Sequence, residues 1–270
     1  MSRLMLRGQE VRIIAALHLP PMPSVAQPRV SSLAEVIAYA RRNASIALEN
    51  GVHGLYIQDL GDYPVARTVQ PHTIARVTTV GYALRQDFPN AVLGVCLMAH
   101  GAEGPLAVAQ AMDADFVRLK VYIGAMVKAE GLLQGCAYDA IQYRAMIRAD
   151  NIAILADVYD RTGKPLGAMP LTEAARQSVT FGRADGLILT GQNFNESMTM
   201  IDEVRYAGLG VPLLIGGGVT AGNVAQALQV ADGVIVSTAL KRVSDWSADA
   251  IGSDWDVDKI RAFTSAAKHG

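Results

Sequence analysis

The chain has 270 residues, of which 51% are hydrophobic and 18% are charged, and its 24 basic and 25 acidic side chains give a formal net charge of −1. This composition can bury a large core and is too apolar for a disordered chain. No basic run suggests binding to nucleic acid or to an anionic membrane. We therefore expect a protein that handles small molecules.

The chain carries two cysteines, Cys96 and Cys136, which are too few for a disulfide framework and fit no metal-ligand spacing. A reducing compartment is the simplest expectation. The first residues contain no apolar run of signal-peptide length, and no apolar stretch approaches the roughly 18 residues of a spanning helix. These features predict a cytoplasmic protein with no integral membrane segment.

Short apolar segments rich in β-branched residues alternate eight times with longer segments of helical spacing. The apolar segments are residues 11–17, 54–59, 91–98, 115–121, 152–158, 185–191, 212–218 and 232–238. The helical segments are residues 32–51, 71–88, 104–113, 137–150, 171–183, 196–208, 220–230 and 256–268. Strands covered on both faces and joined by right-handed helical crossovers predict one (β/α)₈ barrel over residues 1–270. A doubly wound open sheet is the alternative.

A glycine turn follows the seventh apolar segment. Gly216, Gly217 and Gly218 stand between an apolar strand and a helical segment, where glycine lets the backbone approach a ligand and its free N–H groups can hold a phosphate. Ser237 and Thr238 follow the eighth apolar segment and could face the same anion, with Lys241 adding positive charge. These residues predict a phosphate site, although the glycines could instead only permit a tight turn.

Candidate catalytic groups lie near the ends of other strands, where barrel enzymes carry their working residues. Asp157 ends a strand at a position suited to a base or a metal ligand. Lys120 could bind a substrate anion, form a Schiff base or pair with Asp157. His18 and Asp59 are candidate acid/base groups. Arg118 points the same way as Lys120 but one layer deeper, and is expected to be structural.

The remaining strand ends predict the wall of a substrate pocket. Its expected members are Gln58, Cys96, Tyr122, Tyr159 and Thr190. Cys96 is interpreted as wall and not as a nucleophile, because no histidine stands beside it. Residues 122–135 are expected to form a mobile loop over the site, since their glycines permit movement.

Several segments resemble the BtpA/SgcQ family, which belongs to the ribulose-phosphate-binding barrel group, over nearly the whole chain. They are residues 51–62, 114–127, 130–135, 154–158, 184–191, 216–224 and 231–241. The resemblance implies a barrel, a phosphate site after its seventh and eighth strands, and a soluble or membrane-peripheral protein. It does not imply one reaction, because some members look like assembly factors for photosynthetic complexes and others occur among sugar-utilisation proteins.

The chain departs from the family pattern on the pocket wall. Members usually carry Glu-Asn-Phe-Gly-Asp at residues 58–62, where this chain has QDLGD, and asparagine where Cys96 and Lys120 stand. Histidines commonly follow the position of Asp157, and Gly-Thr-Ser is commoner at residues 237–239. A cation at position 120 and the loss of a carboxylate at position 58 imply a different substrate or altered chemistry.

Two functions are compatible with these residues. The leading interpretation is an enzyme that acts on a phosphorylated sugar or nucleotide-like metabolite by isomerisation, lyase chemistry or C–N/C–O cleavage at the anomeric carbon. The second is a non-catalytic assembly or regulatory protein that keeps the barrel as a ligand sensor. A metal-dependent hydrolase would have only a partial ligand set in Asp59, Asp157 and His18. No cofactor is expected, and a homo-oligomer is expected on general grounds.

Overall fold

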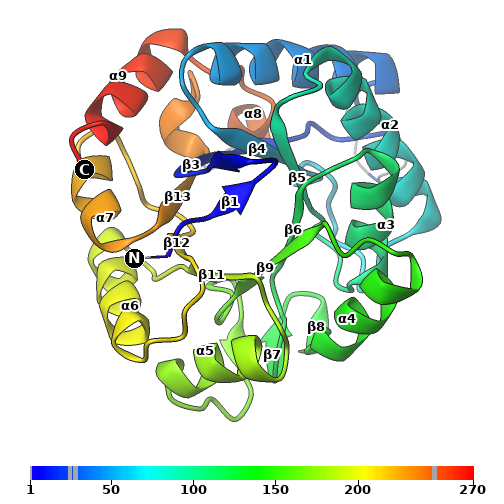
Figure 1. Cartoon of the computed structure of the whole chain (residues 1–270). Helices are drawn as coiled ribbons and strands as arrows, with labels where there is room; N and C mark the ends of the chain where they lie inside the picture. The colour runs from blue at the N-terminus through cyan, green and yellow to red at the C-terminus, as the bar shows by residue number, and fades with distance from the viewer. Residues whose placement is uncertain (1, 24–25, 27–29, 245–247) are drawn as a thin grey trace.

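Eight parallel strands close into a barrel, and helices surround it (Figure 1). The structure, a computed structural model, describes residues 2–23, 26, 30–244 and 248–270. The barrel strands are β3 (Ile13–His18), β4 (Gly54–Gln58), β5 (Val92–Cys96), β6 (Phe116–Leu119), β9 (Ala153–Asp157), β11 (Gly186–Leu189), β12 (Leu213–Ile215) and β13 (Gly233–Val236). Their order around the barrel follows the chain, and β13 pairs with β3 to close it. The predicted (β/α)₈ barrel is confirmed, and the open sheet is excluded.

The long helices surround the barrel (Figure 1), and each has a buried side. In chain order the helices are α1 (Leu33–Glu49), α2 (Pro71–Asp87), α3 (Glu103–Ala111), α4 (Ala137–Met146), α5 (Leu171–Thr180), α6 (Phe194–Tyr206), α7 (Val224–Val230), α8 (Ala248–Ile251) and α9 (Val257–Ala267). A capping box starts α1: the Glu35 N–H donates to Ser32 Oγ at 3.2 Å, and the Ser32 N–H donates to Glu35 Oε2 at 2.7 Å. Val36, Ala40 and Ala44 then form its buried side.

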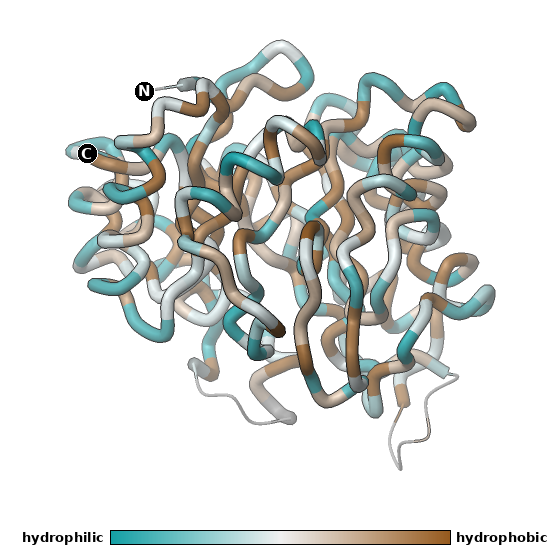
Figure 2. Tube along the Cα trace, turned by 90° about the horizontal axis from the view of Figure 1, so that it is seen from below, coloured by the Kyte–Doolittle hydropathy of each residue, from teal (hydrophilic) through white to brown (hydrophobic). Residues whose placement is uncertain are grey.

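The barrel interior is filled by side chains from alternate strand positions. They are Ile14, Ala16, Tyr56, Val92, Cys96, Phe116, Leu155, Ile188, Leu214 and Ile235. Gly94 leaves room for the Phe116 ring, with which a Cβ at this position would collide. The N-terminal hairpin of β1 (Met5–Leu6) and β2 (Gln9–Glu10) lies across one end, and Leu4 and Leu6 join the interior cluster (Figure 1). Both termini lie at that end (Figure 2). The hairpin therefore closes the barrel on the face away from the C-terminal ends of the strands.

The segment expected to form a mobile loop is instead a β-hairpin. Its strands are β7 (Ala125–Lys128) and β8 (Gly131–Gln134), and β10 (Lys164–Pro165) adds a third antiparallel strand from the loop after β9. Val121, Met126 and Leu133 form a small core beneath it. An ion pair between Lys128 and Asp160 joins the two loops. The loops after β6 and β9 are thus built as one unit.

None of the helices in the described residues combines the length and the hydropathy that crossing a membrane requires.

Candidate functional site

A cavity of about 430 Å³ opens at the C-terminal ends of the barrel strands. The inward residues of the last layer surround it, and the layer below forms its floor, because inward positions recur every second residue. The surrounding layer contributes His18, Gln58, Lys120, Asp157, Thr190, Gly216 and Ser237, and the floor contributes Ala16, Tyr56, Arg118 and Ile235. Gly218 and Thr238 also line it. The structure thus brings most of the predicted site residues to one cavity.

The three glycines of the turn have different surroundings. A Cβ on Gly216 would collide with the Thr190 hydroxyl, and Gly218 has a φ of 79°, which disfavours other residues. These two positions support a role in making the turn. A Cβ on Gly217 would lie 3.6 Å from Arg161 Nη1, so a guanidinium lies close to this backbone. The turn therefore combines tight packing with a nearby cation.

Several donors at this end of the cavity have no acceptor. The Thr190 side chain is buried, with 6% of the residue exposed, and its Oγ1 has no hydrogen-bond partner. Within the described part of the chain, the backbone N–H groups of Gly218, Thr238 and Ala239 donate to no backbone or side-chain oxygen. Gly218 is exposed and Thr238 and Ala239 are half-buried, so solvent can reach their N–H groups, whereas the Thr190 hydroxyl is buried, and buried polar groups in proteins are nearly always satisfied. A polar ligand would supply the missing acceptors.

The cavity floor carries a buried ion pair. Arg118 donates from Nε to Asp157 Oδ2 at 3.0 Å and from Nη2 to Asp157 Oδ1 at 2.9 Å. Its Nη1 donates to the Tyr56 hydroxyl at 2.8 Å. Burial lowers the pKa of Arg118, but the Asp157 carboxylate, together with Tyr56 and Cys96, raises that pKa well above its ordinary value. Asp157 is therefore paired with Arg118, whereas the sequence left open a pair with Lys120.

Three predicted site residues hold the backbone and side chain of Met98. Asp59 Oδ1 accepts from the Met98 N–H at 2.7 Å, and Lys120 Nζ donates to the Met98 carbonyl at 2.7 Å. Gln58 Nε2 lies 3.2 Å from the Met98 sulfur. Burial raises the pKa of Asp59 to about 6. These contacts fix the loop after β5 as one wall of the cavity.

His18 faces Ser237 across the cavity rim. Its Nδ1 lies 3.3 Å from Ser237 Oγ. Burial, together with the positive charges of Lys241 and Arg118, lowers the pKa of His18 to about 3. The imidazole is therefore neutral near pH 7 and can accept or donate one hydrogen bond through each nitrogen.

Other predicted site residues lie away from the cavity. Lys241 Nζ donates to the carbonyls of Ala250 at 2.7 Å and Ile251 at 2.8 Å, so the C-terminal end of α8 holds this ammonium. The Tyr122 hydroxyl donates to the Gly182 carbonyl behind the barrel wall. The Tyr159 hydroxyl donates to the Met169 carbonyl at 2.9 Å.

Cys96 also lies away from the cavity surface, packed in the barrel interior, where burial raises the pKa of its thiol to about 11. The expectations that Lys241 adds charge at the anion and that Cys96, Tyr122 and Tyr159 line the pocket are corrected here. Lys241, Tyr122 and Tyr159 form hydrogen bonds with residues elsewhere in the fold, and Cys96 is covered by the barrel interior.

The cavity also contains residues that the sequence did not single out. Tyr56, Arg161, Thr162 and Thr220 line it. Tyr56 lies two positions before Gln58 on β4, so the alternation of the strand could have identified it. Arg161 and Thr162 belong to a loop with no regular periodicity, so no sequence signal placed them.

The described residues contain no group of three or more His, Cys, Asp and Glu side chains that could hold a metal ion. Of the partial ligand set considered above, Asp59 bonds to the Met98 backbone, Asp157 to Arg118, and His18 to Ser237.

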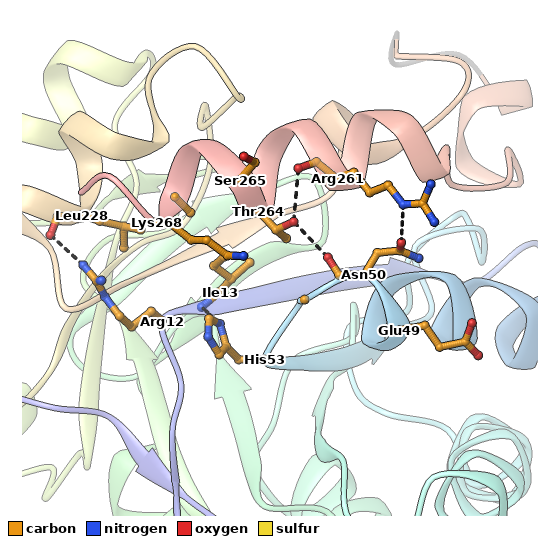
Figure 3. A pocket seen from close by; sticks show the side chains of 12 residues that line it. Arg12, Ile13, Glu49, Asn50, His53, Leu228, Arg261, Thr264, Ser265 and Lys268 are labelled. Carbon is orange, nitrogen blue, oxygen red and sulfur yellow. Dashed lines mark hydrogen bonds between the residues drawn. The ribbon is translucent and has the colours of Figure 1, made fainter.

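A second cavity, of about 490 Å³, lies on the opposite face, between α9, the end of α1 and the start of β3 (Figure 3). Its polar groups largely satisfy one another. Arg261 Nε donates to Asn50 Oδ1 at 2.7 Å, and Thr264 Oγ1 donates to the Asn50 carbonyl at 2.9 Å. Arg12 donates to the Leu228 carbonyl at 3.2 Å. Although it is the larger cavity, these contacts join α9 to its neighbours, so we place the candidate site at the strand ends.

Solved structures share the fold. The chain superposes on 3-keto-L-gulonate-6-phosphate decarboxylase from Vibrio cholerae with a TM-score of 0.57 and 14% identity, covering 96% of this chain and 98% of that one. For phosphoribosyl anthranilate isomerase from Thermus thermophilus the TM-score is 0.53 and the identity 12%, with the same coverages of 96% and 98%. Identities this low establish the fold alone.

Proteins found by sequence comparison have higher identities to this chain than these solved structures have. Photosystem I biogenesis protein BtpA of Synechocystis is 31% identical over 261 residues, which cover 96% of this chain and 88% of that protein. A protein of Archaeoglobus fulgidus is 30% identical over 261 residues, which cover 96% of this chain and 99% of that one. A sequence model of the BtpA family matches residues 9–269. The chain therefore belongs to the BtpA family.

Proposed function

We propose that this protein is an enzyme that binds a phosphorylated sugar-like metabolite in the cavity at the strand ends and transfers protons at the end of the ligand remote from the phosphate. The observation that carries the proposal is the buried Thr190 hydroxyl without a partner, which lies against the glycine turn at Gly216. An apolar ligand would leave this hydroxyl unsatisfied at a cost of about 1–3 kcal/mol. A phosphate oxygen accepts from it.

The phosphate would be held by groups from four strand ends. Thr190 Oγ1, the Gly218 N–H and the N–H groups of Thr238 and Ala239 are donors without acceptors among the described residues. Arg161, whose guanidinium lies near Gly217, supplies positive charge in the position expected for Lys241. Backbone donors combined with a guanidinium are a common way to bind phosphate.

The remote end of the ligand would meet the side of the cavity that carries the titratable groups. His18 is neutral near pH 7, and the Arg118–Asp157 pair forms the floor with Tyr56. Asp157 contributes by holding Arg118 in place. Lys120 and Asp59 hold the cavity wall at Met98 through its backbone. These groups suit isomerase or lyase chemistry, in which a proton moves next to an oxygen that develops charge.

Titration calorimetry with inorganic phosphate and a panel of phosphorylated sugars tests the proposal, with Thr190→Val as the variant. Valine keeps the shape and removes the hydroxyl, so we expect Thr190→Val to weaken phosphate binding about tenfold and to leave the unliganded protein as stable or more stable. Thr264→Val is the matched control, because the Thr264 hydroxyl is satisfied by Asn50. It should lower stability and leave the affinity unchanged. No phosphate binding by the wild-type protein would refute the proposal.

A second candidate is a biogenesis factor that binds a ligand without converting it. The observation that favours it is the 31% identity to Photosystem I biogenesis protein BtpA. Both candidates predict binding, so turnover separates them. Incubation of the protein with each phosphorylated ligand that binds, followed by mass spectrometry and by proton–deuterium exchange, would detect conversion. Binding without conversion or exchange of any ligand would favour the second candidate.

A further inference from the structure

Three polar side chains lie together at the floor of the cavity and at the layer directly above it, although the barrel interior is otherwise apolar. Tyr56 and Arg118 line the cavity, and Asp157 lies beside them with 2% of its side chain exposed. Aliphatic side chains such as Leu155, Ile188 and Leu214 fill the same interior. Burial of a guanidinium among such residues is costly, and its pairing with Asp157 offsets that cost.

The hydrogen bonds at the floor leave donors on Arg118 and Tyr56 without acceptors. Arg118 uses Nε and Nη2 on Asp157 and Nη1 on Tyr56, and a guanidinium has five N–H groups, so two remain. The Tyr56 oxygen accepts from Arg118, and across the described part of the chain its own proton has no recorded acceptor. Each Asp157 oxygen accepts one hydrogen bond from Arg118.

Charge favours an anion at the same place. Lys120 Nζ donates to the Met98 carbonyl and lies 3.8 Å from the Met98 sulfur, and both groups are neutral. Lys120 forms no ion pair with any described residue within 4.0 Å, whereas Asp157 already balances Arg118. Asp59 and Asp157 act on Lys120 at longer range, so the wall above the floor carries an ammonium that no carboxylate of the described residues contacts directly.

We infer that Tyr56 and Arg118 form a binding site for a second negatively charged oxygen of the ligand, remote from its phosphate. This inference rests on the proposed function. The ligand class is a phosphorylated compound with a carboxylate, or with a carbonyl whose oxygen develops negative charge during the reaction. The Tyr56 O–H and a remaining Arg118 N–H donate to that oxygen, and Asp157 is a positioning residue that holds Arg118.

Two small phosphate esters of similar length test this inference. In 2-phosphoglycolate a carboxylate stands at the end opposite the phosphate, and in 2-hydroxyethyl phosphate a hydroxyl stands there. We expect the wild-type protein to bind 2-phosphoglycolate roughly tenfold to a hundredfold more tightly, which is typical of hydrogen bonds to a charged group. Tyr56→Phe should reduce this preference by about tenfold and leave the affinity for 2-hydroxyethyl phosphate unchanged.

Tyr122→Phe is the matched control, because Tyr122 is also a buried tyrosine but donates to Gly182 behind the barrel wall. It should leave both affinities unchanged. Equal binding of the two esters by the wild-type protein, or an unchanged preference in Tyr56→Phe, would overturn the inference while the proposed phosphate site stands. Failure to bind either ester or inorganic phosphate would overturn both.

A crystal structure of the wild-type protein with 2-phosphoglycolate keeps the inference testable if Tyr56→Phe does not fold. We expect the ligand carboxylate within hydrogen-bond distance of Tyr56 Oη and the phosphate at the glycine turn. A carboxylate bound elsewhere would overturn the inference.

Discussion

Arg118 and Asp157 are joined by two parallel hydrogen bonds at the floor of the barrel cavity, at 3.0 and 2.9 Å. The pair is buried: 14% of the Arg118 side chain and 2% of the Asp157 side chain are exposed. Asp157 therefore holds a neighbouring cation, whereas its place at a strand end had pointed to a free base or a metal ligand. A loss of activity in an Asp157 variant would therefore not by itself identify Asp157 as a catalytic base, because the substitution also releases Arg118.

Asp157→Asn should lower the free energy of unfolding by about 3–5 kcal/mol, because it leaves the Arg118 charge buried without its carboxylate. Chemical denaturation followed by circular dichroism measures this change. Asp87→Asn is the control: Asp87 pairs with Arg41 at the surface, where an ion pair contributes up to about 1 kcal/mol. Equal effects of the two substitutions would contradict the prediction.

Arg161→Gln should weaken the binding of inorganic phosphate about tenfold and reduce its dependence on salt, because a hydrogen bond to a charged group is lost. Lys241→Met should leave the affinity unchanged and lower stability, since Lys241 Nζ satisfies the carbonyls of Ala250 and Ile251. Calorimetry at two salt concentrations measures the affinities. If Lys241→Met weakened phosphate binding and Arg161→Gln did not, the cation that binds phosphate would be Lys241 and not Arg161.

The ionisation of Asp59 should reduce stability as the pH rises. Burial raises its pKa from 3.8 to about 6, so the folded protein binds more protons than the unfolded chain between these values. The contribution of Asp59 to the free energy of unfolding should therefore fall by about 2 kcal/mol from pH 4 to pH 6, with a slope of at most about 1.36 kcal/mol per pH unit. Asp59→Asn, which keeps an acceptor for the Met98 N–H, should remove this contribution.

The measurement is the difference in unfolding free energy between Asp59→Asn and the wild-type protein at pH 4 and pH 7. The variant should gain relative stability at the higher pH, while Asp87→Asn should show no comparable change. A difference that did not vary with pH would contradict a raised pKa of Asp59.

His18 should remain neutral well below the usual range of histidine. With a pKa of about 3 in the folded protein and about 6.5 when unfolded, it makes stability fall as the pH drops from 6.5 towards 3. Nitrogen-15 NMR of the ring should show no protonation of His18 between pH 8 and pH 5. A midpoint near 6.5 without ligand would contradict this.

The alternation of apolar strands and amphipathic helices was enough to predict the barrel. Because inward positions recur every second residue, it also identified the ring of His18, Gln58, Lys120, Thr190 and Ser237 that surrounds the cavity. Parallel strands have their carboxyl ends on one face of the barrel. Residues far apart in the chain can therefore be assigned to one cavity before their contacts are known.

The tertiary structure alone decided which of these side chains have partners. The register of β6 and β9 sets Arg118 opposite Leu155 and Leu119 opposite Ala156, and the long Arg118 side chain reaches along the barrel to Asp157. A loop without periodicity brings Arg161 to the glycine turn, and the carbonyls at the end of α8 hold Lys241 away from it. Local periodicity fixes the direction of a side chain, but its hydrogen bonds depend on neighbours that the sequence separates by tens of residues. In this cavity those neighbours leave the Thr190 hydroxyl without a partner.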